Sequence, residues 1–294
     1  MSLRIGTRGS ALALAQTNRV AGNLADRGID VEIVTIATEG DIATTVPLHA
    51  IGGQGVFVRA LDDAILRGEI DAAVHSMKDI PAARPAGLIC SAVLERDSPA
   101  DFLVHECPLD AVSVVGSSST RRRAQLLRDA PALSVKPLRG NVDTRIRKLR
   151  EGQYDAIVLA EAGLQRLGLT LPGEPLPTDR FVPSPNQGTI AVVCRDDPDV
   201  IGAFAPLDHA PTRLDVEIER AVMEEVGGGC FTPQGIYCRD GDLIAEVLAL
   251  DGSRWERIER RVATIDEARE WGRTLARQAA GLIREAYVAL GMKP

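Results

Sequence analysis

Residues 3–37, LRIGTRGSALALAQTNRVAGNLADRGIDVEIVTIA, decide the fold of the first part of the chain. They begin and end with short aliphatic and β-branched runs, a composition typical of strands. Between these runs Val20, Ala21 and Leu24 fall on one face of a helix. The stretch therefore predicts a strand, a helix and a second strand, the unit from which α/β sheets are built.

The same alternation recurs after residue 110. AVSVVG (111–116) and YDAIVLA (154–160) are strand patterns, and TRRRAQLLRD (120–129) is a helix pattern. The Pro- and Gly-rich segment 169–188 is typical of a connector, and the strand pattern after it fits a chain that returns to the first sheet. We expect domain 1 to comprise residues 1–94 and 189–206, and domain 2 residues 95–188.

The pattern changes after Pro211. A helix precedes three strand patterns joined by the turns DGD and DGS, and one amphipathic helix carrying Trp271, Leu275 and Leu282 closes the chain. We expect residues 210–294 to form a smaller α+β domain. The fold class is therefore α/β, with two α/β domains and this third unit.

Composition excludes several classes of protein. The 294 residues carry a net charge of −7, which disfavours a nucleic-acid binder. The N-terminal segment has no leader pattern and no run is long enough to span a membrane, so we expect a cytoplasmic protein. Five cysteines without CxxC spacing indicate reduced thiols, and four histidines without ligand spacing give no reason to assign a metal.

Charge is unevenly distributed. Residues 116–150 contain ten Lys or Arg and only two acids, Asp129 and Asp143. A basic segment in an acidic protein suits an anionic small ligand, and solvated helix faces are the alternative.

Two candidate sites follow strands of the first domain. HSMKD (75–79) places Lys78, which could bind a carboxylate, beside Asp79, which could stabilise positive charge. GTRGS (6–10) places Arg8 and Ser10 at a helix start, where anions bind. A surface salt bridge and a simple N-cap are the alternatives. We interpret His75 and Ser76 as structural.

The second domain repeats this arrangement. GSSSTRRR (116–123) puts arginines in a first helical turn, where they oppose the helix dipole, and a bound anion would resolve that conflict. LRGNVDTR (138–145) adds arginines at another strand end, suited to gripping carboxylates. The candidates are Ser118, Ser119, Arg121, Arg122, Arg139 and Arg145.

GGGC (227–230) predicts a loop that allows close backbone approach, and we expect the Cys230 thiol to be exposed. Taken by itself, this motif could also be a tight turn in which the cysteine has no function.

Taken in order, TRGSALALAQ, VHSMKDIP, SSSTRRRAQ, LRGNVDTR, YDAIVLAEAGLQRLGL, ERAV and GGGC give a chain that resembles the porphobilinogen deaminase (hydroxymethylbilane synthase) family from Arg8 to Cys230. The resemblance implies two periplasmic-binding-protein-like α/β domains with a cleft between them and a third α+β domain. It implies that four porphobilinogen molecules are joined head to tail with loss of ammonia, and that hydroxymethylbilane is released by hydrolysis. It also implies a monomer whose partners are porphobilinogen and the growing polypyrrole, with no nucleic acid or membrane.

The resemblance assigns roles residue by residue. Cys230 matches the cysteine that holds a dipyrromethane cofactor by a thioether, Asp79 the catalytic aspartate, and Lys78 its basic neighbour. The residues that match binders of acetate and propionate groups are Arg8, Ser10, Ser118, Ser119, Arg121, Arg122, Arg139 and Arg145.

The chain departs from the family pattern at Gln54, where the family often has lysine, at Thr120, and at PSPNQG (183–188). These departures concern lid and hinge details rather than the reaction. The alternative hypothesis is a non-catalytic anion-binding protein of periplasmic-binding-protein ancestry.

Overall fold

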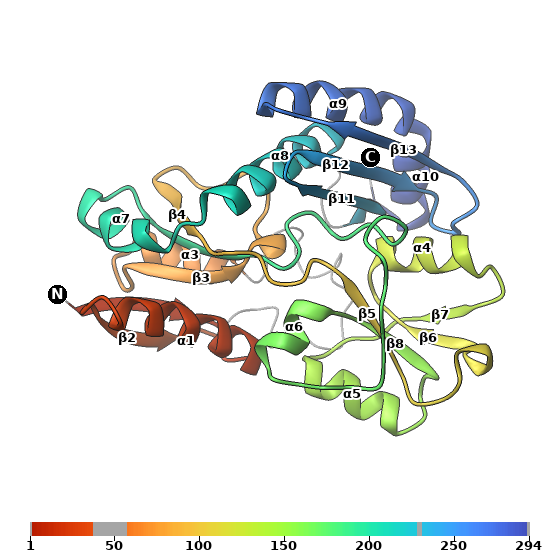
Figure 1. Ribbon diagram of the computed structural model, residues 1–294, viewed down its shortest axis with the longest axis horizontal. Coiled ribbons are helices and arrows are strands. Elements are labelled where there is room, and N and C mark those ends of the chain that lie inside the picture. The colour runs from red at the N-terminus through yellow and green to blue at the C-terminus, as the bar shows by residue number, and fades with distance from the viewer. Residues whose placement is uncertain (1, 38–57, 228–230, 293–294) are drawn as a thin grey trace. The chain divides into compact units, whose positions relative to one another are not determined.

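The structure is a computed structural model that describes residues 2–37, 58–227 and 231–292 (Figure 1). Contacts between residues divide the chain into two compact units, which are described separately. Unit 1 comprises residues 1–97, 166–168 and 188–213, and unit 2 comprises residues 98–165, 169–187 and 214–294.

Unit 1 is built on a five-stranded mixed sheet in the order β2-β1-β3-β10-β4. The strands β2, β1 and β3 are parallel, whereas β10 runs antiparallel to both β3 and β4. The pairing of β10 with β3 confirms that the chain returns to the first sheet after the connector. The strands are β1 Ser2–Thr7, β2 Asp30–Thr35, β3 Ala72–Ser76, β4 Leu88–Val93 and β10 Ile190–Arg195.

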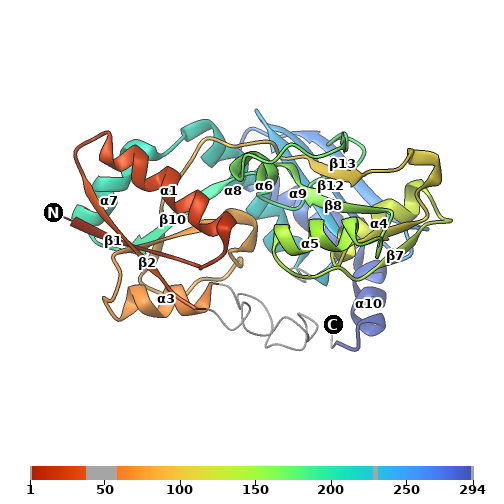
Figure 2. The ribbon, with the colours of Figure 1, turned by 90° about the horizontal axis from the view of Figure 1, so that it is seen from below.

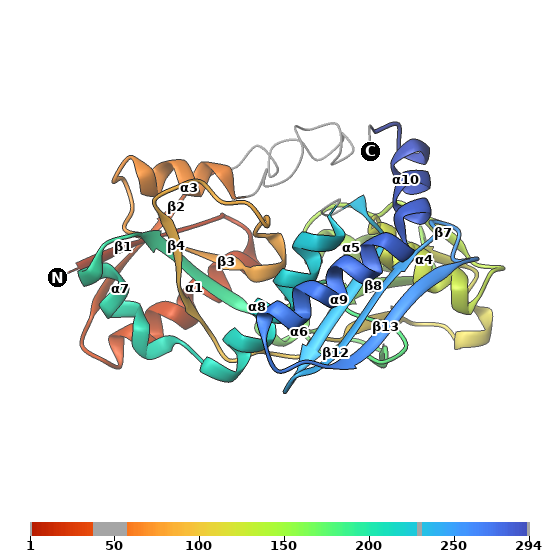
Figure 3. The ribbon, with the colours of Figure 1, turned by 90° about the horizontal axis from the view of Figure 1, so that it is seen from above.

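Helices cover both faces of this sheet. Val20 and Leu24 of α1 pack with Val200 and Phe204 of α7 against β1 side chains such as Ile5, so α1 and α7 share one face. Figures 2 and 3 show α3 on the opposite face from α1. These helices are α1 Ala11–Ala25, α3 Arg59–Leu66 and α7 Pro198–Phe204.

Unit 2 contains a second five-stranded sheet, in the order β7-β6-β8-β5-β9. Three parallel strands are again followed by an antiparallel one, so the two sheets repeat one arrangement. Leu126 of α4 packs on one face, and Ile146 of α5 and Leu164 of α6 pack on the other. The elements are β5 Asp101–His105, β6 Val114–Gly116, α4 Thr120–Asp129, β7 Ser134–Lys136, α5 Val142–Arg150, β8 Ala156–Ala160, α6 Glu161–Arg166 and β9 Gly173–Pro175.

The C-terminal part of unit 2 is an antiparallel sheet, β11-β12-β13, covered by helices. Figure 3 shows α9 lying along β12 and β13. The single final helix predicted from sequence is wrong, because the chain turns at fully buried Ala279. This turn lets both Leu275 and Leu282 reach the same core. The elements are α8 Ala210–Val226, whose first four residues belong to unit 1, and β11 Gln234–Arg239, β12 Asp242–Leu248, β13 Trp255–Arg261, α9 Ile265–Gln278 and α10 Ala280–Ala289.

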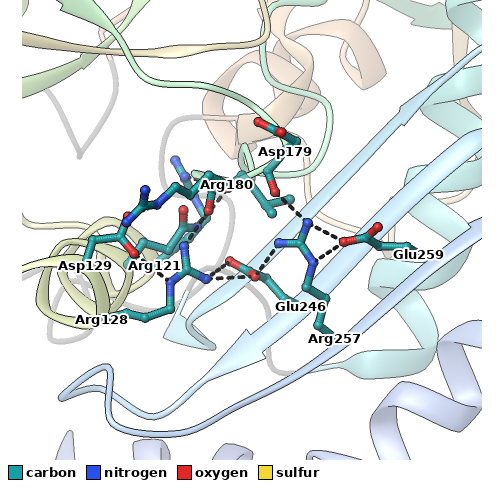
Figure 4. Close-up of polar contacts among 10 residues, drawn as sticks. Arg121, Arg128, Asp129, Asp179, Arg180, Glu246, Arg257 and Glu259 are labelled. Carbon is teal, nitrogen blue, oxygen red and sulfur yellow. Dashed lines mark hydrogen bonds and ion pairs between the residues drawn. The ribbon is translucent and has the colours of Figure 1, made fainter.

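A buried carboxylate joins α4 to this sheet within unit 2 (Figure 4). Glu246 of β12 has no exposed surface and accepts from Arg128 of α4 at 3.0 Å and from Arg257 of β13 at 3.1 Å. The two guanidinium groups also donate to the backbone carbonyls of Arg180 and Asp179. Burial raises the pKa of Glu246, and the two arginines act against that rise. The cluster connects three separate segments of the chain.

These observations confirm the predicted fold class of two α/β sheets and a smaller α+β part. All strands of any one sheet lie within a single one of the three expected domains. The exact domain boundaries stay a prediction. Within the described residues, no helix is both long enough and apolar enough to cross a membrane.

Candidate active site

The first candidate site lies where β1 and β3 end. The two strands are parallel neighbours with Gly6 opposite Ala73, so the residues that follow them occupy the same edge of the sheet. Gly6 lets the chain pass close to Ile70, since a Cβ atom there would stand 2.3 Å from the Cδ1 atom of Ile70 and displace that side chain. Arg8 follows β1 and is half-buried, and Asp79 follows β3 and is exposed.

Asp79 ends a short 3-10 turn, Met77–Asp79. The amide of buried Met77 donates to the carbonyl of Thr189 at 2.9 Å, and the amide of Ile80 closes the turn by donating to Met77 at 3.1 Å. Lys78, between them, is half-buried. The backbone is therefore anchored on the N-terminal side of Asp79.

Ser10 is the N-cap of α1 and its hydroxyl oxygen accepts from the amide of Ala13 at 3.3 Å. The N-cap alternative is therefore correct, and it does not exclude a ligand. A hydroxyl that accepts one hydrogen bond still has its own proton to donate.

His75 is buried beside this site. Burial, reinforced by the positive charges of Arg84 and Arg8, lowers the pKa of His75 to about 3. The ring is neutral at physiological pH, which agrees with its interpretation as structural.

A network around Arg166 has no counterpart among the sites predicted from the sequence. Its guanidinium group is 7% exposed and donates to Asp97 at 2.8 Å, to Gln16 at 3.0 Å and to the carbonyl of Gly188 at 2.6 Å. Ser76, three residues before Asp79, donates to the same oxygen of Gln16 at 2.9 Å.

Burial lowers the pKa of Arg166, and the charges of Asp97 and Asp79 oppose that shift. The charge of the Asp79 carboxylate therefore acts on the Arg166 guanidinium group. The available sequence signal was Gln16, a polar residue that shares the buried face of α1 with Val20 and Leu24.

The second candidate site lies at the matching edge of unit 2. Gly116 of β6 is opposite Lys136 of β7, so the segments that follow these parallel strands share one edge. Ser119 is the N-cap of α4 and accepts from the amide of Arg122 at 3.3 Å. Ser118 donates its only hydroxyl proton to the carbonyl of Leu138 at 2.9 Å, which ties the two segments together.

The arginine pair of α4 is engaged inside the protein. Arg121 and Arg122 are 4% and 7% exposed, and both form ion pairs with fully buried Asp101, at 2.7 and 2.6 Å. Burial alone would raise the pKa of Asp101, but the two arginines hold that pKa well below its ordinary value. In the described structure, the carboxylate that pairs with both arginines belongs to the chain itself. Two cations and one anion leave the cluster with one net positive charge.

Arg139 and Arg145 are half-buried in the segment after β7 and in α5. The Nε atom of Arg145 donates to the carbonyl of Gly140 at 2.7 Å, and Lys148 donates to the carbonyl of Arg139 at 3.2 Å. Gly140 has a φ of +116°, which favours glycine. These bonds hold the segment of Arg139 and Gly140 against α5, the helix that carries Arg145.

The structure thus groups Arg8, Ser10, Lys78 and Asp79 at one sheet edge and the other six predicted binding residues at another. Cys230 and Gln54 lie outside the described residues.

Comparisons with known proteins identify relatives over almost the whole chain. The family model described as porphobilinogen deaminase, dipyromethane cofactor binding domain, matches residues 3–202, and the model of the porphobilinogen deaminase C-terminal domain matches residues 213–281.

Among curated proteins, a probable porphobilinogen deaminase of Methanosarcina acetivorans is 50% identical, over 96% of this chain and 93% of the relative. A probable porphobilinogen deaminase of Archaeoglobus fulgidus is 46% identical over 96% and 100% of the two chains. The porphobilinogen deaminase of Nitratidesulfovibrio vulgaris is 42% identical over 98% and 97%. A solved periplasmic substrate-binding protein from Coxiella burnetii is 16% identical over 71% and 93%, with a TM-score of 0.43.

Proposed function

The chain belongs to the porphobilinogen deaminase family, and on that premise we propose that it joins four porphobilinogen molecules head to tail with loss of ammonia. The proposed activity is that of a transferase, and its product, hydroxymethylbilane, is released by hydrolysis. Growth starts from a dipyrromethane primer attached through a thioether to Cys230. We expect the enzyme to act as a cytoplasmic monomer.

The position of Asp79 carries this proposal. Its carboxylate is exposed on a turn at the sheet edge it shares with Arg8, and it follows Lys78 directly. In each coupling a carbon–nitrogen bond breaks and ammonia leaves. A carbon–carbon bond then forms, and the accepting pyrrole carbon loses its proton. Positive charge develops on pyrrole rings during these steps, and a fixed carboxylate nearby stabilises it.

The cationic side chains of the two candidate sites suit a cofactor and a product that carry many carboxylates. Every pyrrole unit carries an acetate and a propionate group, so a lengthening chain presents many carboxylates. We propose that Arg8, Lys78, Arg139 and Arg145 bind these groups directly, since guanidinium and ammonium groups are suited to carboxylates.

When bound, the dipyrromethane supplies the nucleophilic pyrrole carbon for the first coupling. We propose that it is held by Arg139, Arg145 and the start of α4. There the Ser119 hydroxyl keeps a proton to donate, and Ser10 does so at the start of α1. Arg121 and Arg122 contribute the net positive charge of their cluster with Asp101, which favours an anion at the helix start. Ser118 positions the segment near Leu138, and its own contact with a ligand requires that its present bond be exchanged.

The proposal is tested by porphobilinogen consumption in the wild type and in Asp79→Asn, which keeps the side-chain shape and removes the charge. Turnover should fall by at least about 100-fold, a loss typical of removing a group that stabilises transition-state charge. Asp30→Asn is the matched control, because Asp30 is also exposed but begins β2 at the opposite edge of the sheet. Equal rates in Asp79→Asn and the control would refute the role of Asp79. No consumption by the wild type would favour a non-catalytic anion-binding protein.

A further inference from the structure

A buried ion pair lies beside the segment that leaves Asp79. Arg84 donates from Nη2 to the Oδ1 atom of Asp62 at 2.8 Å, and the two side chains are 15% and 4% exposed. Asp62 is on α3, and Arg84 is in the irregular segment between the turn of Asp79 and β4. The pair therefore joins that segment to a helix that packs on the sheet.

The chain around Asp79 is therefore anchored at one point before it and at one point five residues after it. On its N-terminal side the amide of Met77 is bound to Thr189, and on its C-terminal side Arg84 is bound to Asp62. Residues 80–87 contain no helix or strand that would fix their path. A side-chain contact that fixes this path also restricts where the Asp79 carboxylate can lie.

The pair contributes less to stability than its short distance suggests. Burial raises the pKa of Asp62 to about 6, so desolvation of the carboxylate exceeds the attraction of Arg84. Buried ion pairs often stabilise a fold less than apolar residues of the same size would. Within the described residues, the buried Nη1 atom of Arg84 and the buried Nε2 atom of His75 also have no hydrogen-bond partner.

The surrounding charges connect the pair to the site. Two charged groups act on the Asp62 carboxylate. One is Arg84, from the segment after the turn, and the other is Asp63, the next residue of α3. The positive charges of Arg84 and Arg8 both lower the pKa of His75 in β3. The pair is therefore part of the same charged region as the candidate site, and not a separate surface feature.

We propose that the Asp62–Arg84 ion pair positions the turn that carries Asp79, so that Asp62 and Arg84 are positioning residues for the coupling reaction. This inference rests on the proposed function. If Asp79 stabilises charge that develops in the transition state, a displaced Asp79 lowers kcat and leaves KM for porphobilinogen nearly unchanged.

The test compares full-length Arg84→Met, Arg84→Lys, Asp62→Asn and wild type. For each, kcat, KM, the melting temperature and the intact mass are measured. Arg84→Met and Asp62→Asn should each lower kcat by about tenfold or more, since small displacements of catalytic groups have effects of this order. KM should stay within about twofold of the wild type. Arg84→Lys keeps the cation and should restore most of kcat.

Asp71→Asn is the matched control. Asp71 binds Arg4 at 2.8 Å and directly precedes β3, so it holds the end of the strand opposite to Asp79. A loss of kcat equal to that of Arg84→Met in this control would show a general effect of stability and overturn the inference. An insoluble Arg84→Met protein, or an Arg84→Lys variant as slow as Arg84→Met, would overturn it as well. Normal kcat in Arg84→Met beside an active wild type would refute this inference alone, whereas an inactive wild type would refute the proposed function.

Discussion

The Nη2 atom of Arg122 lies 2.6 Å from the Oδ1 atom of Asp101, in an ion pair shielded from solvent. Arg121 binds the other carboxylate oxygen at 2.7 Å. Asp101→Asn would leave two buried guanidinium groups without their anion. We expect it to lower the free energy of unfolding by about 3–5 kcal/mol, measured by urea unfolding.

Asp242→Asn is the control for that change, since its ion pair with Arg261 is about 70% exposed on both sides. Exposed pairs contribute less than about 1 kcal/mol. Equal losses in the two variants would show that Asp101 does not hold the start of α4 as described.

The stability of the wild type should depend on pH through Asp62. Its pKa is about 6 in the folded protein and about 3.9 in an unfolded chain, so the folded state binds the proton more tightly between these values. The free energy of unfolding of the wild type, relative to Asp62→Asn, should therefore increase as pH falls from about 6.5 to 4, by up to about 3 kcal/mol. Urea unfolding of both proteins across this range measures the difference. A constant difference would contradict the raised pKa.

The Glu246 cluster should matter for stability. Glu246→Gln removes the charge that Arg128 and Arg257 share, and we expect it to lower the free energy of unfolding by about 3 kcal/mol or more. Glu259→Gln is the control, because Glu259 also binds Arg257 but is 63% exposed. Thermal unfolding of both variants should show a large shift for Glu246 and a small one for Glu259. The opposite order would contradict the cluster's assigned role.

Arg145 should contribute to binding rather than to folding. Arg145→Leu is expected to raise KM for porphobilinogen by about tenfold, the effect of one lost charge-assisted hydrogen bond. Arg147→Leu tests the same substitution on the same helix at a side chain that is 62% exposed and paired with Glu151. Steady-state kinetics with a melting curve for each variant separate the two effects. Unchanged KM in Arg145→Leu would contradict its assignment.

Local sequence patterns were sufficient for much of the fold. The apolar periodicity of α1 and the aliphatic residues of β1 and β8 reflect burial on one or both faces, which favours these elements directly. Three strands, β4, β5 and β9, were not predicted. The Gly173–Pro175 strand lies in the Pro-rich connector and is defined only by its pairing with β5, a contact that no local pattern encodes.

The candidate site was predictable where residues follow strands. Arg8 and Asp79 were found because parallel strands end at one edge. The buried residues that pair with the arginines of these sites were not predicted. Asp101 was a strand residue without a local signal, and its ion pairs with Arg121 and Arg122 join positions about twenty residues apart. Arg166 and Asp97 are separated by 69 residues and meet only in the folded chain.

The central claim is that this chain builds a polypyrrole on a primer tethered to Cys230, and intact mass spectrometry tests it most directly. Purified wild-type protein should be heavier than its sequence by one dipyrromethane and should gain further increments of one pyrrole unit when mixed with porphobilinogen. Cys230→Ser should show the sequence mass alone before and after mixing. A wild-type protein that consumes porphobilinogen while its mass equals that of the unmodified sequence would contradict the claim.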